Sequence, residues 1–290
     1  MKLPSGVSLN FSGPALVMAI VNCNKDSFYA PSRALGKDAV EKALAAEKDG
    51  AAIVDFGAES SRPGASYISE EEELKRLIPV ISAFRKCSSL PVSVDTRKAA
   101  VAGAAIDAGA DIINDISALA DDDPKMTKVC AEKGAAVVLM HKKGEPLTMQ
   151  KAPSYSDVVE ELRAFFDDSI KRALSGGISS EKIILDPGIG FGKGLKDNLK
   201  IIRLLAEICG KDYPILVGLS RKSFIGELTG RFGVAGTAED RLAGTLAVNS
   251  TAILLGADII RVHDVKEHVD LAKVLFSITQ ESNDGMASEF

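Results

Sequence analysis

The chain has 290 residues, of which 46% are hydrophobic and 26% are charged, a mixture typical of a folded globular protein rather than a disordered one. Lys and Arg total 35 and Asp and Glu total 40, so the formal charge of -5 offers no basic excess for binding nucleic acid or an anionic membrane. The chain lacks Trp and has only 5% aromatic residues, which disfavours a stacking surface for single-stranded nucleic acid.

The cysteines are scattered, and none has Cys-x-x-Cys spacing or a His at ligand spacing. They are Cys23, Cys87, Cys130 and Cys209. This pattern disfavours a zinc site or a disulfide framework and suits a reducing compartment. The first apolar run lacks the features of a signal peptide, and no run approaches the roughly 18 apolar residues of a membrane helix. We therefore expect a cytoplasmic protein.

Short runs rich in Val, Ile, Leu and Ala alternate along the chain with longer segments of helical periodicity. The runs are continuously apolar, which predicts strands buried on both faces of a parallel sheet. The predicted strands are Leu16–Asn22, Ala51–Gly57, Pro91–Thr96, Asp111–Ile116, Ala135–His141, Lys182–Gly188, Pro214–Ser220 and Asp258–Asp264. The predicted helices are Lys37–Asp49, Glu70–Lys86, Ala99–Ala108, a helix capped by Asp123 that starts at Pro124, Asp157–Leu174, Asp197–Cys209, Glu239–Leu255 and Val265–Thr279.

Eight strands alternating with helices over about 250 residues predict an α/β fold, a single-domain (β/α)8 TIM barrel. A doubly wound open sheet is the alternative that the pattern alone leaves open. No linker divides the chain, so we expect one barrel domain over residues 1–280 and a frayed polar tail over residues 281–290. Several predicted helices end in glycine just before the next strand. These glycines are Gly50, Gly109, Gly134, Gly210 and Gly256.

Polar residues stand at the carboxyl ends of the predicted strands. They are Asn22, Asp55, Glu59, Asp95, Thr96, Asn114, Asp115, His141, Asp186, Ser220, Arg221, Lys222, Arg261, His263 and Asp264. A barrel gathers these ends at one mouth, where barrel enzymes do their chemistry. A single polar residue at a strand end is commonly just a loop residue, but eight such ends predict an active site.

Two groups of these residues differ in charge. Asp95, Asn114 and Asp186 can pair with a planar ligand that donates several N–H bonds, although each could instead cap the following helix. The second group is basic and follows strands seven and eight, where barrels often hold phosphate. Its members are Arg221, Lys222, Arg261 and His263. The basic group predicts a site for a small anion, with a rim of surface salt bridges as the alternative.

The glycine-rich stretch Gly188–Gly194 fits neither a P-loop nor the dinucleotide-binding fingerprint, because its spacing is wrong for both. We expect a flexible loop whose backbone lies close to a ligand. His141, His263 and His268 lack the spacing of a metal triad, and we expect His268 on the surface of the last helix. Residues 140–144 would add positive charge to the mouth. An ordinary solvated loop would account for these basic residues equally well.

These residues lie in phrases that resemble the bacterial dihydropteroate synthase family over roughly residues 14–280. The phrases are Asp26–Phe28, Glu59–Ala65, Ser93–Thr96, Ile113–Ile116, Leu139–His141, Leu185–Lys193, Ser220–Lys222 and Arg261–Val265. The resemblance implies a TIM barrel, commonly a homodimer, that is the target of sulfonamides. It also implies the activity: p-aminobenzoate is joined to 6-hydroxymethyl-7,8-dihydropterin pyrophosphate with Mg²⁺, giving dihydropteroate and pyrophosphate for folate synthesis.

The resemblance also implies roles for individual residues. The implied pterin-binding residues are Asp95, Asn114, Ile116, Met140, Asp186 and Lys222. The implied pyrophosphate-binding residues are Asn22, Arg261 and His263, with Asn22 also a ligand of Mg²⁺. The implied p-aminobenzoate surroundings are Phe28, Ser61, Arg62, Pro63, Phe191 and Ser220. The catalytic set is then Asp95, Asp186, Lys222, Arg261 and His263, and no covalent nucleophile is required.

The first loop departs from the family pattern Asn-x-Thr-Pro-Asp-Ser-Phe-Ser-Asp-Gly-Gly. Thr-Pro is replaced by Asn24-Lys25, and Ser-Asp-Gly-Gly is replaced by residues 29–32, Tyr-Ala-Pro-Ser. Losing the Gly pair changes the freedom of the loop, and losing the Asp removes one possible metal contact. Ser61 stands where Thr is commoner and keeps the hydroxyl group. The departure puts the Mg²⁺ dependence of the first loop in question.

Two other functions compete with synthesis. A pterin-dependent methyltransferase domain shares the barrel and part of the pterin pocket, but it needs no basic cluster at 220–222 and 261–263. A paralogue without synthase activity would bind pterin pyrophosphate without turnover because of its altered first loop.

Overall fold

The computed structural model describes residues 1–23, 35–59, 67–144, 148–150, 153–230 and 235–284. Its strands are β1 (Leu16–Asn22), β2 (Ile53–Gly57), β3 (Val92–Asp95), β4 (Ile112–Asp115), β5 (Ala136–Met140), β6 (Ile183–Asp186), β7 (Leu216–Val217) and β8 (Ile259–Val262). Its helices are α1 (Leu35–Lys48), α2 (Glu70–Arg85), α3 (Ala99–Asp107), α4 (Lys125–Lys133), α5 (Val158–Ser175), α6 (Leu195–Arg203), α7 (Leu205–Cys209), α8 (Ser223–Thr229), α9 (Leu242–Leu254) and α10 (Val265–Asp284). Short 3-10 helices, η2 (Ser180–Lys182) and η3 (Glu239–Arg241), precede β6 and α9.

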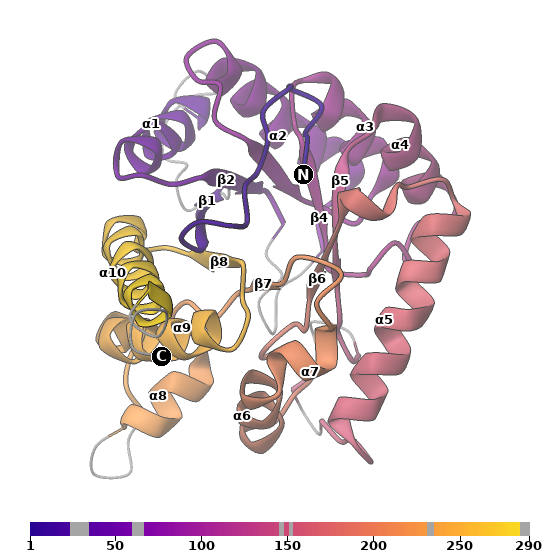
Figure 1. The fold of residues 1–290 in the computed structure, drawn as a ribbon. Coiled ribbons are helices and arrows are strands. Elements are labelled where there is room, and N and C mark those ends of the chain that lie inside the picture. Colours follow the sequence, from indigo (N-terminus) through magenta and orange to yellow (C-terminus); the bar gives the residue numbers. More distant parts are fainter. Residues whose placement is uncertain (24–34, 60–66, 145–147, 151–152, 231–234, 285–290) are drawn as a thin grey trace.

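The strands form one parallel sheet that curls into a barrel. Their order is β6-β5-β4-β3-β2-β1-β8-β7, and a parallel bridge between Leu185 and Ile215 brings the two end strands together. The helices surround the strands, as Figure 1 shows. The prediction of a (β/α)8 TIM barrel is confirmed, and the open doubly wound sheet is excluded.

All eight predicted strands are present, each within its predicted range, and the glycines expected after helices all have positive φ. Four helix predictions were wrong. Helix α8 was missed, and the helix expected over 197–209 is broken into α6 and α7 at Leu204. Helix α4 begins at Lys125, so Pro124 precedes its first turn. Helix α10 continues to Asp284, so residues 281–284, expected in the frayed tail, are helical.

The barrel interior is apolar at the end where the strands begin. One buried cluster there consists of Leu3, Leu9, Met18, Ile53, Ile112, Ala136, Val138, Ile184, Leu216 and Ile259. Leu3 and Leu9 come from the N-terminal segment, whose Lys2 and Ser8 form an antiparallel bridge. In Figure 1 this indigo segment lies across the strands. It therefore plugs the barrel at this end, which we call the bottom.

A second apolar layer lies between the strands and the helices. Its members include strand residues that alternate with those of the inner cluster, such as Val54 and Val137, and helix residues such as Leu77 and Phe84. Because side chains of a strand point alternately to its two faces, each strand contributes to both layers. With the bottom of the inner face filled by apolar side chains, the polar residues at the carboxyl ends face the other mouth, which we call the top.

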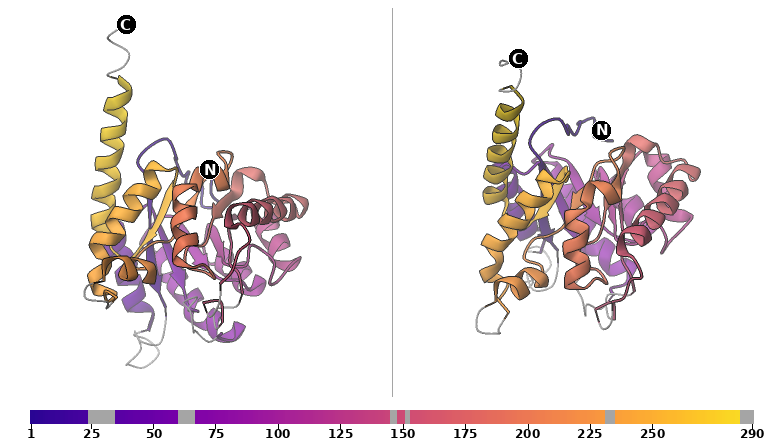
Figure 2. Two further views of the ribbon diagram at one scale, coloured as in Figure 1. Left: turned by 90° about the horizontal axis from the view of Figure 1, so that it is seen from below. Right: turned by 60° about the horizontal axis from the view of Figure 1, so that its bottom comes forward.

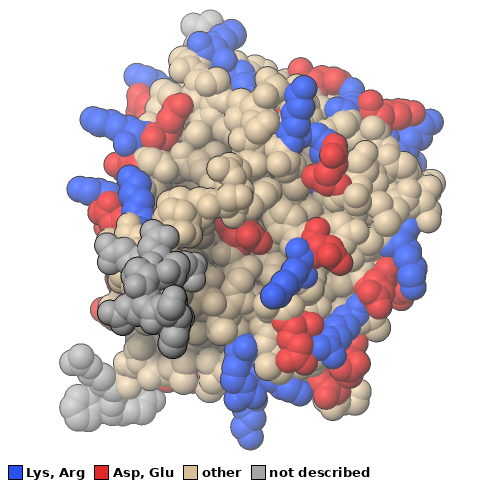
Figure 3. Space-filling view, viewed as in Figure 1, with Lys and Arg blue, Asp and Glu red and all other residues tan. Residues whose placement is uncertain are grey.

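Helix α10 reaches beyond the rest of the fold, as both views in Figure 2 show. Within the described residues, no helix is both long and apolar enough to cross a membrane. On the face drawn in Figure 3, basic and acidic side chains are interspersed rather than gathered into a patch of one sign.

Candidate active site

The inner face of the barrel turns polar toward the top. Asp55 stands two residues beyond Ile53 in β2, and Asn114 stands two residues beyond Ile112 in β4. Asp186 and Arg261 follow Ile184 and Ile259 by the same two-residue step. Asp95, at the end of β3, pairs in register with Asn114. The two-residue period of the strands thus brings side chains of five strands together above the apolar plug.

Arg261 is held between two carboxylates. Its Nε lies 2.6 Å from Oδ2 of Asp55, and its Nη2 lies 3.2 Å from Oδ2 of Asp95. The amide of Asn114 donates to the same oxygen of Asp55 at 3.3 Å. Asp55 is fully buried, and its other oxygen, Oδ1, has no hydrogen-bond partner among the described residues. Asp55 therefore orients both Arg261 and Asn114, a role that the sequence left unassigned although it placed Asp55 at a strand end.

The two carboxylates share one guanidinium, so their negative charge exceeds the positive charge beside them. Burial raises the pKa of Asp95 to about 7, although the nearby Arg261 counteracts the shift. The neighbouring charge of Asp55 adds to it. Burial therefore favours the protonated form of Asp95, and a ligand that donates a hydrogen bond to it would favour the carboxylate.

Asp186 ends β6 on the same inner face. Its Oδ1 accepts a hydrogen bond from the backbone N–H of Gly188 at 2.7 Å. Burial raises its pKa to about 6, while that N–H and the charges of Lys222 and Lys193 counteract the shift. Two buried carboxylates with raised pKa values at the same end of the barrel are typical of a functional site rather than of helix caps.

The glycine-rich loop after β6 lies directly on the loop after β5. A Cβ atom on Gly188 would come within 1.9 Å of the carbonyl oxygen of His141, and one on Gly192 within 2.0 Å of that of Lys143. Both glycines also have positive φ, which other residues rarely adopt. The close packing of two backbones thus explains these glycines, and the flexibility expected of this loop stays a prediction.

Lys222 and Phe191 meet above Asp186. The Nζ of Lys222 lies 4.0 Å from the centre of the Phe191 ring, a cation–π contact. Met140 and Ile116, expected beside a pterin ring, are buried at the ends of β5 and β4. The mouth therefore presents a flat ring and an ammonium group beside apolar walls.

The basic group expected after β7 and β8 is only partly assembled. Ser220 Oγ lies 2.9 Å from Nδ1 of His263, whose side chain is exposed. Arg221 instead forms a double ion pair with Asp264, with N···O distances of 2.9 and 2.7 Å, and donates to the carbonyl of Ala238. Its φ of 54° turns it toward that carboxylate. The expectation that Arg221 joins an anion site was therefore wrong in this structure.

The other two histidines are structural. His268 is fully buried, so the expectation of a surface residue was wrong. Its Nδ1 lies 2.6 Å from the carbonyl oxygen of Asp264, and its Nε2 lies 3.0 Å from the amide of Asn249. His141 is buried, and its ring packs edge-on against Phe165 at 4.7 Å.

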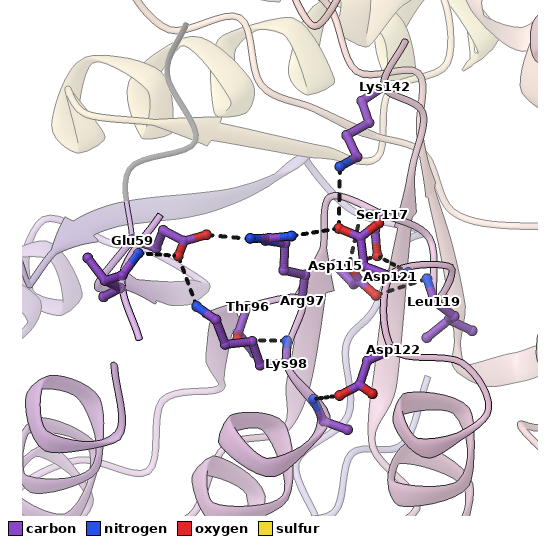
Figure 4. Close-up of polar contacts among 12 residues, drawn as sticks. Glu59, Thr96, Arg97, Lys98, Asp115, Ser117, Leu119, Asp121, Asp122 and Lys142 are labelled. Carbon is purple, nitrogen blue, oxygen red and sulfur yellow. Dashed lines mark hydrogen bonds and ion pairs between the residues drawn. The ribbon is translucent and has the colours of Figure 1, made fainter. Parts of the chain in front are cut away.

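A chain of ion pairs links the ends of four consecutive strands, as Figure 4 shows. Arg97 lies between Glu59, at 3.3 Å, and Asp121, at 2.9 Å. Lys142 also approaches Asp121, at 3.4 Å. Lys98 donates to Glu59 at 2.9 Å, so Glu59 is held by two cations. These pairs tie the rim of the mouth together after β2, β3, β4 and β5.

Glu59 also accepts a hydrogen bond from the backbone N–H of Ile68 at 2.9 Å. Burial opposes the shift, but the bonds from Lys98 and Ile68 lower the pKa of Glu59, so it stays ionised. Asp115 is likewise used inside the fold, since it accepts bonds from Ser117 and Leu119 at 2.7 and 2.9 Å. Glu59 and Asp115, which the sequence placed among the polar strand-end residues, are thus both engaged in contacts within the fold.

Part of the predicted site lies outside the described residues. This part contains Phe28, Ser61, Arg62 and Pro63, together with the unusual residues 24, 25 and 29–32 of the first loop.

Asn22 ends β1 with its side chain exposed, and its amide oxygen is a kind of donor that Mg²⁺ accepts. Among the described residues, no three or more His, Cys, Asp or Glu side chains are grouped to hold a metal ion. Mg²⁺ commonly keeps several waters and binds through one or two protein oxygens together with substrate phosphates. The donors fit a Mg²⁺ that is held mainly by a diphosphate.

The fold and this mouth define a barrel enzyme of the pterin-binding class. Residues 18–263 match the family described as "Pterin binding enzyme". The chain is 45% identical over 277 residues to the dihydropteroate synthase of Escherichia coli (strain K12), covering 95% of each protein.

Two solved structures agree with this match. The Yersinia pestis dihydropteroate synthase with a sulfonamide drug complex has a TM-score of 0.87 and 39% identity, covering 95% of this chain and 98% of that one. The Xanthomonas albilineans enzyme with 4-aminobenzoic acid has a TM-score of 0.85 and 41% identity, covering 93% and 95%. The chain therefore belongs to the dihydropteroate synthase family.

Proposed function

We propose that this protein is a dihydropteroate synthase, which condenses 6-hydroxymethyl-7,8-dihydropterin pyrophosphate with p-aminobenzoate to give 7,8-dihydropteroate and pyrophosphate. The observation that carries the proposal is the polar layer inside the top of the barrel. There Arg261 and Asp55 orient Asp95 and Asn114, and the backbone N–H of Gly188 orients Asp186.

The pterin is expected to lie flat in this space. Its ring edge donates several N–H bonds, which Asp95 and Asp186 accept, while Asn114 can both donate and accept. Met140 and Ile116 supply buried apolar surface for the ring. Lys222, beside Asp186, adds a further donor at the ring's other edge.

The diphosphate is expected above the ends of β1 and β8, which are neighbouring strands. Asn22 and His263 are exposed there, and Arg261 supplies positive charge from below. Bound Mg²⁺, with Asn22 as its protein ligand, would neutralise charge on the leaving group.

The p-aminobenzoate is expected beside the Phe191 ring and Ser220, with Phe28, Ser61, Arg62 and Pro63 completing its surroundings from the first two loops. The support is the pairing of Phe191 with Lys222, which sets a flat apolar surface next to a cation. A benzoate combines the complementary features, a flat ring and an anionic end. The Xanthomonas albilineans relative was solved with this same compound.

The reaction needs no nucleophile from the protein. The bond between the pterin methylene and the diphosphate oxygen breaks, and the electron-rich pterin ring spreads the resulting positive charge. Asp95 and Asp186 stabilise that charge, while Arg261, His263 and Lys222 stabilise the departing diphosphate. The neutral amine of p-aminobenzoate then forms the C–N bond and releases a proton. The first two loops are expected to cover this site and exclude water.

The test is pyrophosphate release by the purified protein given pterin pyrophosphate and p-aminobenzoate, with and without Mg²⁺. We expect release only with both substrates, together with a dihydropteroate product, and faster release with Mg²⁺. Tight binding of pterin pyrophosphate without product would identify a binding paralogue instead. Cobalamin-dependent methyl transfer would identify the methyltransferase alternative.

We also propose a homodimer in the cytoplasm. An apolar groove between α6, α8 and α9 supports the dimer, because Leu199 and Leu228 are exposed on it. Four free thiols support a reducing compartment. Light scattering on the wild type and on Leu228→Glu tests the dimer: we expect a dimer that the substitution dissociates, and a monomeric wild type would contradict it.

A further inference from the structure

Lys193 is a cation buried inside the top of the barrel. It follows the glycines of the loop after β6, and its side chain is only 2% exposed. Its ammonium group lies near four acceptors from two different loops. These are Nδ1 of His141 at 2.8 Å, the carbonyl of Gly188 at 2.9 Å, and the carbonyls of His141 and Phe191, both at 3.2 Å.

These contacts fix the chemical state of His141. When Lys193 is an ammonium group it donates and cannot accept, so Nδ1 of His141 is then the unprotonated ring nitrogen and Nε2 carries the hydrogen. Burial lowers the pKa of His141 to about 3, and the charge of Lys193 adds to the shift. His141 is thus a neutral ring held against Lys193.

The four acceptors are the backbone and side-chain groups that set the geometry of the mouth. Gly188, one of these acceptors, also donates its backbone N–H to the carboxylate of Asp186. The carbonyl of Phe191 belongs to the residue whose ring faces Lys222. The His141 groups belong to the loop after β5, onto which the two glycines are packed. Lys193 therefore joins two loops at the point where the substrates are expected to meet.

Burial of the Lys193 ammonium group costs free energy, so we expect its hydrogen bonds to serve a purpose that an apolar side chain could not. Burial lowers the pKa of Lys193 to about 7, although the charge of Asp186 counteracts the shift. Methionine would fill nearly the same space without that cost. What methionine cannot do is donate hydrogen bonds to carbonyls from both loops.

We propose that Lys193 is a positioning residue that couples the loops after β5 and β6 and so places the Phe191 ring against Lys222 for the incoming amine substrate. The inference rests on the proposed function for the identity of that substrate. The coupling of the two loops is a property of the chain itself.

The test compares Lys193→Met with wild type in steady-state kinetics for each substrate. We expect the KM for p-aminobenzoate to rise about 10- to 100-fold, because a small misplacement of a contacting group has effects of this size. The KM for pterin pyrophosphate should change less than about threefold, because Asp186 and Asn114 are held by strands. Lys193→Gln, which retains two donors, should recover part of the loss and also serves if the methionine variant does not fold.

Arg85→Met is the matched control. Arg85 also ties carbonyl groups together, those of Gly109 at 2.7 Å and Leu90 at 2.5 Å, but near the bottom of the barrel. Its loss should lower stability and leave both KM values unchanged. Equal increases in both KM values for Lys193→Met, or an unchanged KM for p-aminobenzoate, would overturn the proposal.

Hydrogen exchange separates this proposal from the proposed function. In Lys193→Met, amides of residues 187–193 and 141–144 should exchange faster than in wild type and in Arg85→Met. Unchanged exchange there overturns the coupling of the loops, whatever the activity. If the wild type binds neither substrate, the proposed function fails, while faster exchange in the variant still supports the coupling.

Discussion

The two ends of the barrel interior are built from the same strands, but the bottom is apolar and the top is polar and charged. At the bottom, residues such as Ile112 and Ile184 fill the space completely, and the N-terminal segment covers them. Two residues further along the same strands stand the polar Asn114 and Asp186, and nearby Asp55 keeps an oxygen without a partner among the described residues. The bottom stabilises the fold, whereas the top holds charges that only a ligand can satisfy fully.

The largest expected effect is on stability at the bottom. Ile112→Ala should lower the free energy of unfolding by about 2–5 kcal/mol, because it leaves a cavity in a fully buried cluster. The KM values for both substrates should stay unchanged. Urea unfolding together with kinetics checks this. A large rise in either KM with little loss of stability would mean that the two ends are not separate.

Removing a charge at the top should lower activity and leave the stability of the fold almost unchanged. Lys222→Ala is expected to lower kcat/KM by about 100- to 1,000-fold, as the loss of one group that stabilises developing charge commonly does. Its unfolding transition should stay close to that of the wild type, since Lys222 is not part of the apolar core. Wild-type turnover by the folded variant would remove Lys222 from the mechanism.

A smaller effect is expected on ligand affinity alone. Asp186→Asn should weaken pterin binding about 10- to 100-fold, because a hydrogen bond to a charged acceptor becomes one to a neutral group. Binding of p-aminobenzoate should be much less affected. Calorimetry with each ligand decides the matter, and the reverse order of effects would overturn the assignment of the two pockets.

The smallest expected effect is on the pH dependence of stability. The pKa of Asp95 is about 7 in the folded protein, above its ordinary value of 3.8, so folding favours the protonated form. Stability should therefore decrease as pH rises from about 4 to about 7, because over this range the unfolded chain has lost the proton that folded Asp95 retains.

Asp95→Asn should make this decrease about 1 kcal/mol smaller, and Asp107→Asn, at an exposed position, should not change it. Chemical denaturation at several pH values provides the measurement. Parallel curves for Asp95→Asn and wild type would show that Asp95 is ionised throughout.

The sequence predicted the part of the site that depends on strand order and period. Asp95, Asn114 and Asp186 end buried strands, so a barrel necessarily brings them to one mouth. It did not predict that Asp55 holds Arg261, because β1 lies between β2 and β8 and the two side chains meet by reaching past that strand inside the barrel.

The other differences depend on contacts between segments distant in sequence. Arg221 turns to Asp264 from the next strand's end, and His268 is buried because Asn249 of α9 meets it. Lys193 looks like a solvent-exposed loop lysine in the sequence, since its acceptors in the loop after β5 lie about 50 residues away. The sequence of one chain predicts which strand ends form such a site, but it does not predict which partners the long side chains contact.

The N-terminal plug also constrains the order in which the chain can fold. Leu3 and Leu9 are made before every strand of the barrel, yet the cluster that buries them includes Ile259 of the last strand. Contacts with so large a separation in sequence form late, after most of the barrel is in place. The cluster around these two leucines therefore stays incomplete until the last strand has been made, so a segment that precedes the barrel in the sequence depends for its burial on the barrel's final strand.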